Sequence, residues 1–199
     1  MSFIVTISGS PSPQSRTRQL SEHVAGRLGL QGFDVASINV RDLPTEDLIY
    51  AQSESTAVRG ALRLVDRAIG IVIATPVYKA SYSGVLKTFL DLLPQLGLQG
   101  KVVLPLIVGG TNAHVLALDY ALRPVLLSLG AQHVVAGLFL LDKLLQRTVT
   151  GALEVDPEIR PRLDGVIADF VDSVKRRGRV SATEALDHAG MRASEPGGG

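Results

Sequence analysis

One stretch of the chain constrains its fold more than any other, the segment 71–91, which reads IVIATPVYKASYSGVLKTFLD. It opens with the β-branched apolar run Ile71–Ile73, which predicts a strand buried on both faces. Thr75 and Pro76 are expected to end this strand, because proline lacks the N–H that a strand ladder requires. A polar loop follows, and apolar residues at helical spacing then predict a helix over 84–93. A buried strand that leads into a polar loop and a helix is the place where open α/β sheets bind ligands, although an ordinary βα turn with surface tyrosines is the simpler alternative.

The rest of the chain repeats this alternation of strands and helices. It predicts a three-layer α/β fold, with a five-stranded parallel sheet and right-handed crossovers that put helices on both faces. Residues 1–177 are expected to form one domain, and the small, polar residues 178–199 a flexible C-terminal tail. The four further strands are expected at 3–8, 33–39, 101–108 and 132–140, and the other helices at 15–28, from Ser55 or Thr56 to Gly70, at 113–129 and at 156–177.

The composition excludes several classes of function. The 20 Lys and Arg against 19 Asp and Glu leave a net charge of +1, whereas nucleic-acid binding normally needs a concentrated basic face. The chain has no cysteine and only four scattered histidines, so disulfides and thiolate chemistry are excluded and no metal site is expected. The amino terminus lacks the features of a signal peptide, and no apolar stretch approaches the roughly 20 residues of a membrane helix. We therefore expect a cytoplasmic protein with neither a nucleic-acid nor a membrane partner.

The loop after the first strand has the composition of a phosphate site. Residues 8–17, SGSPSPQSRT, place several hydroxyls and one cation where a helix begins. Free N–H groups at a helix start favour an anion, and Ser15, Arg16 and Thr17 add further donors. The loop lacks the glycine–lysine pattern of a P-loop and the G-x-G-x-x-G of a dinucleotide fold. Taken alone, it is equally consistent with a turn in which Ser15 only caps the helix.

Several motifs together resemble the NAD(P)H-dependent FMN reductases of the flavodoxin-like class. The resemblance covers residues 3–140, and its nearest branch is the flavin reductase of two-component alkanesulfonate monooxygenase systems. It implies a flavodoxin-like fold and an NAD(P)H:FMN oxidoreductase. The motifs are GSPSPQSRT at 9–17, EDLIYA at 46–51, TPVYKASYSGVLKTFLDLLP at 75–94, LQGKVVLP at 98–105 and GGTNAHVLALDYALRPVL at 109–126.

The resemblance also implies which residues bind the flavin. Ser12 stands where the family often has a basic residue, so part of the phosphate charge is expected to fall to Arg16. The resemblance implies no catalytic acid, base or nucleophile, because hydride passes directly between stacked nicotinamide and flavin rings. The expected cofactor-binding residues are Ser10, Ser15, Arg16 and Thr17 for the phosphate, Pro76, Val77, Tyr78, Lys79 and Ala80 for the ring, and Gly109, Gly110 and Thr111 for its far side.

Pro124 predicts an irregular helix in the segment 113–129. Its ring removes the amide that would bond the Tyr120 carbonyl, so a kink or a π-bulge is expected there. The resemblance places Tyr120 at a tetramer interface close to the flavin, where it keeps the flavin a transient substrate; the simpler alternative is a surface tyrosine on a core helix. The expected partners are FMN, NADPH or NADH, an FMNH2-dependent monooxygenase, and further copies of the chain in a dimer or tetramer.

Two other functions are compatible with the same fold. A flavodoxin-like one-electron carrier would hold FMN tightly, but such carriers are typically acidic and this chain is balanced in charge. A reductase of quinones or azo dyes would use the same flavin with a different acceptor. The colour of the purified protein separates the carrier from the reductases, and the rates with FMN and with quinones separate the two kinds of reductase.

Overall fold

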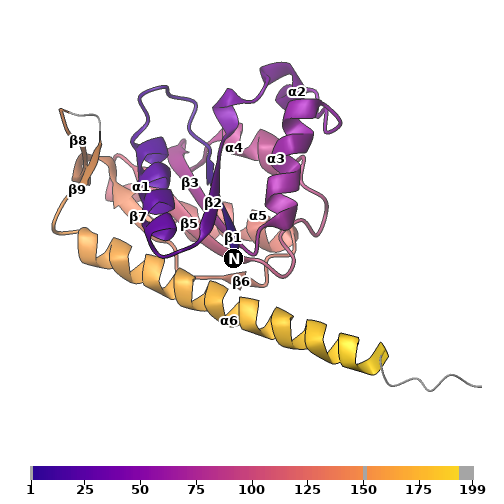
Figure 1. Cartoon of the computed structure of the whole chain (residues 1–199). Coiled ribbons are helices and arrows are strands. Elements are labelled where there is room, and N and C mark those ends of the chain that lie inside the picture. The colour runs from indigo at the N-terminus through magenta and orange to yellow at the C-terminus, as the bar shows by residue number, and fades with distance from the viewer. Residues whose placement is uncertain (1, 150–151, 193–199) are drawn as a thin grey trace, which may run out of the picture.

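The computed structural model describes residues 2–149 and 152–192, with side chains as far as residue 179. Its centre is a parallel sheet in which the strands run in the order β2-β1-β3-β5-β6, and β7 also pairs with β5 (Figure 1). This is the 2-1-3-4-5 order of doubly wound, flavodoxin-like sheets. The expected fold class is therefore confirmed. The strands are β1 (Phe3–Ser8), β2 (Asp34–Asn39), β3 (Gly70–Tyr78), β5 (Val102–Gly109), β6 (His133–Val134) and β7 (Leu138–Leu141).

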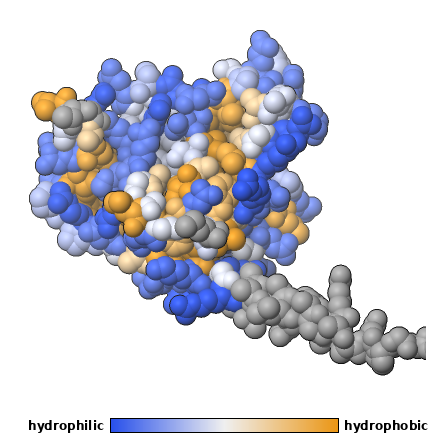
Figure 2. All heavy atoms as spheres, viewed as in Figure 1, coloured by the Kyte–Doolittle hydropathy of each residue, from blue (hydrophilic) through white to orange (hydrophobic). Residues whose placement is uncertain are grey.

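Helices cover both faces of this sheet. On one face α1 (Arg16–Leu30) and α6 (Arg160–Arg192) pack, and on the other α3 (Thr56–Arg67), α4 (Gly84–Leu90) and α5 (Arg123–Ser128). Successive strand side chains enter opposite layers, because the side-chain period of a strand is two residues. Figure 2 shows hydrophilic side chains over α1 and the outer side of α3, with an apolar band between them. None of the helices in the described ranges combines the length and apolar character of a membrane span.

Short elements complete the connections between the main ones. The long link after β2 holds η1 and α2, and a two-stranded hairpin, β8 with β9, follows β7. These elements are η1 (Val40–Asp42), α2 (Thr45–Ile49), β4 (Ser81–Tyr82), η2 (Asn112–His114), the π-helix η3 (Leu118–Leu122), η4 (Asp142–Leu144), β8 (Leu145–Arg147) and β9 (Leu153–Val155).

The expectation that Thr75 and Pro76 end the central strand is wrong. β3 continues through Pro76 to Tyr78 and then pairs with β4 in an antiparallel hairpin. The carbonyl of Ala74 accepts a hydrogen bond from the Gly9 amide, at 2.8 Å, and alternate residues of a strand face the same side. The missing N–H of Pro76 therefore faces the region beyond the end of β1, where strand pairing has already stopped. Proline is tolerated where no ladder bond is lost.

The expected fifth strand, 132–140, is divided into β6 and β7. Both pair with β5, but the register shifts by one residue between them, so that three residues at 135–137 lie opposite two of β5. The carbonyl of Val103 accepts from the first amide of this segment, at 3.0 Å, and Pro105 faces the same side two residues later without an N–H. The bulge therefore coincides with a donor that β5 lacks, and prolines inside sheets are typically found at such sites.

The segment 113–129 is not one regular helix. It comprises η2, the π-helix η3 with Tyr120 at its centre, and α5, in which Pro124 occupies the first turn. The sequence predicted a kink or a π-bulge near Tyr120, and the structure has the π-helical form. Proline at this position has no N–H to donate to the preceding turn, which favours the wider π-helical spacing.

The last helix is longer than expected. α6 continues beyond residue 177 to Arg192 and projects past the body of the molecule (Figure 1). The extension reads GRVSATEALDHAGMR, which contains no proline and several strong helix formers, so local propensity supports it. The limit of the domain at residue 177 stays a prediction, and residues 193–199 of the expected tail lie outside the described residues.

Candidate functional site

Three loops and the end of β7 meet in a hollow at the carboxyl edge of the sheet, with a volume of about 220 Å³. The loops follow β1, β3 and β5, which are neighbours in the sheet. Carboxyl ends of parallel strands at a reversal of strand order are where such folds bind ligands. The hollow is lined by Ser10, Ser12, Gln14, Ser15, Arg16, Thr17, Pro76, Val77, Tyr78, Val108, Gly109, Gly110 and Asp142.

Most of the residues expected to bind the cofactor line this hollow. All four phosphate candidates, the ring candidates from Pro76 to Tyr78, and the glycine pair at 109–110 are present. Lys79, Ala80 and Thr111 are exposed and lie outside the lining. Four further residues line the hollow that are not among the expected cofactor-binding residues: Ser12 and Gln14 from the expected phosphate loop, and Val108 and Asp142 from outside the expected loops.

The start of α1 provides donors for an anion. Ser15 caps the helix, since its hydroxyl accepts from the Arg18 amide at 3.1 Å. Its carbonyl accepts from the Gln19 amide, also at 3.1 Å. Among the described residues, nothing accepts from the amides of Arg16 and Thr17, the first two residues of the helix. Two N–H groups at a helix start, with a guanidinium beside them, form a site for a phosphate group.

A buried hydrogen-bond network joins the first two loops. Ser83, the N-cap of α4, accepts from the Leu86 amide at 3.0 Å and donates to the Gly9 carbonyl. The Ser83 amide donates to the hydroxyl of Thr75 at 3.1 Å. Both side chains are almost completely buried, so each bond is shielded from water. The network fixes the loop after β1 against the end of β3.

A strained turn connects β3 to β4 beside the hollow. Tyr78 pairs with Ser81, and the two residues between them, Lys79 and Ala80, have φ angles of 50° and 63°. Positive φ at both central positions is the type I′ hairpin turn, which normally uses Asn and Gly. Each non-glycine residue in this conformation costs about 1–2 kcal/mol. Because the chain reverses direction at this turn, Tyr78 lines the hollow and Lys79 and Ala80 do not.

Burial also affects the neighbouring tyrosine of the hairpin. Tyr82 in β4 is half-buried, and this desolvation raises the pKa of its phenol. The group is therefore neutral at physiological pH. It provides no negative charge near the hollow.

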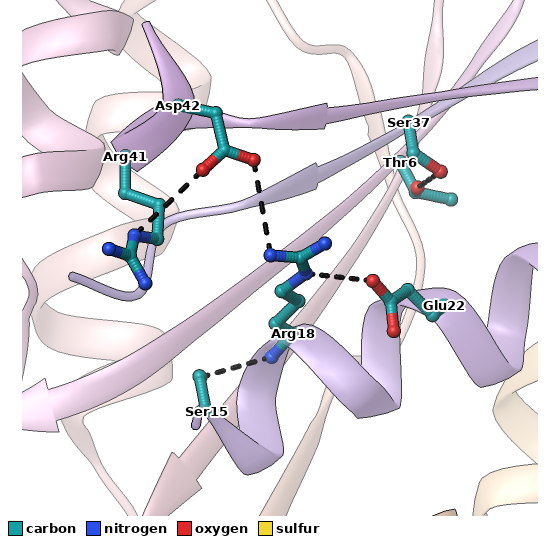
Figure 3. A network of polar contacts seen from close by, with 7 residues as sticks. All are labelled: Thr6, Ser15, Arg18, Glu22, Ser37, Arg41 and Asp42. Atoms are coloured by element: carbon teal, nitrogen blue, oxygen red, sulfur yellow. Dashed lines mark hydrogen bonds and ion pairs between the residues drawn. The ribbon is translucent and has the colours of Figure 1, made fainter. Parts of the chain in front are cut away.

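Two arginines at the start of α1 have different surroundings. Arg16 lines the hollow and pairs with Asp142, with 3.3 Å between Nη1 and Oδ2. Arg18 lies outside the lining and pairs with Glu22 at 2.8 Å and with Asp42 at 3.9 Å (Figure 3). The hydrogen bond to Glu22 raises the pKa of Arg18. Arg16 is therefore the cation that an anion in the hollow would meet.

Comparison with known proteins decides the family. The sequence profile described as NADPH-dependent FMN reductase matches residues 3–146. The chain belongs to this family. It is an oxidoreductase that uses NADPH or NADH together with FMN, as the motifs indicated.

Individual relatives cover nearly the whole chain. The FMN reductase (NADPH) of Escherichia coli (strain K12) is 42% identical over 174 residues, which is 87% of this chain and 91% of the relative. The FMN reductase (NADPH) of Pseudomonas putida is 42% identical over 186 residues, 93% of this chain and 94% of the relative. The structure of the apo form of NADH:FMN oxidoreductase (EMOB) superposes with a TM-score of 0.79 at 40% identity, and covers 87% of this chain and 90% of that one.

Proposed function

We propose that this reductase binds FMN in the hollow at the carboxyl edge and passes reduced FMN to a separate monooxygenase of the alkanesulfonate or organosulfur type. The phosphate lies at the start of α1, and the flavin ring lies against residues 76–78 and the glycine pair at 109–110. One observation carries the proposal. The unused helix amides, Arg16 and an uncharged platform from β3 and β5 line a single hollow.

The lining suits a flat aromatic ring joined to a phosphate. Pro76, Val77 and Val108 offer apolar surface, and Gly110 leaves space for backbone contact. A Cβ on Gly109 would lie 2.6 Å from the Phe139 ring, so this strand end admits no side chain. When bound, FMN would accept the hydride from the reduced nicotinamide. The residues of the chain bind the flavin, orient its ring and exclude water on one side.

The proposed function is tested by comparing acceptors and colour. We expect a nearly colourless protein that oxidises NADPH or NADH rapidly when excess FMN is added, and that supports sulfonate oxidation when an alkanesulfonate monooxygenase is present. A protein that purifies yellow and exchanges single electrons would be a carrier. Faster turnover with quinones or azo dyes than with FMN would identify the other kind of reductase, and would contradict the proposal.

Tyr120 is expected to weaken the retention of flavin. It is 79% exposed at the centre of the π-helix, which packs against β4 beside the hollow. Tyr120→Ala should leave FMN bound through purification and lower kcat with free FMN by about tenfold, because flavin release then limits turnover. The measurements are the visible spectrum of the purified protein and steady-state oxidation of NADPH.

Tyr50→Ala is the matched control for this variant. Tyr50 is 72% exposed and lies at the end of α2, outside the lining of the hollow. The Tyr50→Ala protein should purify colourless and oxidise NADPH with free FMN at the normal rate. A colourless Tyr120→Ala protein with normal turnover would show that this tyrosine has no part in flavin release.

A further inference from the structure

Asp142 reaches the proposed phosphate site from a part of the chain that none of the recognised motifs includes. It follows β7 directly and begins η4. β7 runs parallel to β5, with Leu141 opposite Gly109, so the next residue lies at the same sheet edge as the glycine pair. Its carboxylate lines the hollow and pairs with Arg16. The cation that would meet the phosphate therefore already has an anionic partner.

The charges of the lining cancel. Among the described residues that line it, Arg16 and Asp142 are the only ones with a formal charge, one positive and one negative. The others are serine, threonine, glutamine, glycine, proline, valine and tyrosine. Both charged side chains remain about half-exposed, at 51% and 43%, so water can solvate each of them when they separate. A phosphate monoester carries a charge of about −1.5 to −2 at pH 7. It meets a hollow with no net positive charge.

We propose that Asp142 competes with the flavin phosphate for Arg16 and thereby sets a low affinity for FMN. The inference rests on the proposed binding of FMN in this hollow. When the phosphate binds at the start of α1, Arg16 exchanges one anionic partner for another, and the Asp142 carboxylate stays nearby as a like charge. Both effects favour release of the nucleotide. A reductase that delivers reduced FMN to another enzyme requires such release.

The alternative role for Asp142 is to hold Arg16 in position for the phosphate. The two roles predict opposite changes in the affinity for FMN when the carboxylate is removed. If the carboxylate only orients the guanidinium, its removal weakens FMN binding. If it competes, its removal strengthens FMN binding, and the strengthening requires the phosphate.

Asp142→Asn tests the proposal, because asparagine keeps the shape of the side chain and removes its charge. Equilibrium dissociation constants for FMN and for riboflavin, which lacks the phosphate, are measured by quenching of flavin fluorescence at low and at high salt. We expect FMN to bind about tenfold more tightly at low salt, equivalent to about 1.4 kcal/mol. Riboflavin should bind unchanged. In about 1 M salt the gain for FMN should shrink, since the Debye length falls to about 3 Å.

Asp91→Asn is the matched control. Asp91 is in an exposed ion pair with Lys87, with side chains 43% exposed for the lysine and 57% for the aspartate, and neither residue lines the hollow. The variant makes the same change in net charge and should leave both dissociation constants unaltered. An equal gain in this control would assign the effect to net charge alone and overturn the role of Asp142.

The remaining outcomes separate the two proposals. Unchanged or weaker FMN binding by Asp142→Asn, with the wild-type protein binding FMN normally, overturns the competition and leaves the proposed function intact. A gain that is equal for riboflavin and FMN also overturns it, because the phosphate would then have no part. If the wild-type protein binds neither flavin, the proposed function itself fails.

Discussion

Replacing Arg16 by glutamine is expected to raise the dissociation constant for FMN by about thirtyfold and to leave that for riboflavin nearly unchanged. A hydrogen bond to a charged group contributes about 1.5–3 kcal/mol, and each 1.4 kcal/mol is about a factor of ten. Within the part of the chain that the structure describes, Arg16 provides the only positive side chain in the lining of the hollow. Its loss should therefore affect only a ligand that carries the phosphate. Fluorescence titration with both flavins measures the difference.

Arg18→Gln provides the comparison for this result. Arg18 lies two residues along the same helix, but it pairs with Glu22 and Asp42 (Figure 3). It does not line the hollow. FMN binding should change little in this variant. Equal losses of FMN affinity in both variants would indicate a general effect of charge, and equal losses of FMN and riboflavin in Arg16→Gln would place the phosphate elsewhere.

Gly9→Ala is expected to destabilise the fold by about 3 kcal/mol, at the upper end of the usual cost of overpacking a core. A Cβ on Gly9 would lie 2.5 Å from the Cβ of Leu86, which is completely buried. Relief requires α4 to move, and the Ser83 hydrogen bond to the Gly9 carbonyl opposes that movement. Urea unfolding, followed by circular dichroism, measures the free energy of unfolding.

The matched control is Gly84→Ala, at the first residue of α4. No atom lies within 4 Å of a Cβ built there, and the position is helical. Alanine should stabilise this protein by up to about 1 kcal/mol, because it restricts the unfolded chain more than glycine does. If Gly9→Ala unfolds at the wild-type urea concentration, the close approach of the loop to α4 does not constrain the structure.

Local signals were sufficient for most of the secondary structure. The buried apolar runs predicted the main strands. Ser15 and Ser55, each offered by the sequence as one of two possibilities, are the N-caps of α1 and α3, because an N-cap depends on nearby backbone groups. The effect of proline was not local. Pro76 leaves its strand unbroken and Pro105 coincides with a bulge, and the difference depends on which neighbouring strand each missing N–H faces. Only the assembled sheet contains that information.

In the candidate site, too, some residues were predictable from local sequence and others depend on the assembled sheet. The composition of the loop after β1 indicated a phosphate site, whereas the family resemblance supplied the individual residues on the loops after β3 and β5, most of which line the hollow. Asp142 was missed because it has no motif, and its place in the hollow depends on the register of β7 against β5. The exposed turn at Lys79 and Ala80 was also missed, since the resemblance assigned a run of consecutive residues to the ring without showing where the backbone turns back.

The bulge at 135–137, between β6 and β7, determines which residue follows the far end of β7 and so which charge lies beside Arg16. Continuing the pairing of β7 beyond Leu141 puts Asp142 level with Gly110; in the register of β6, without the additional residue, Leu141 would stand there instead. A leucine would then occupy the place from which Asp142 pairs with Arg16. The ion pair that balances the charge of Arg16 therefore depends on a register shift that lies opposite Pro105, in the middle of the sheet.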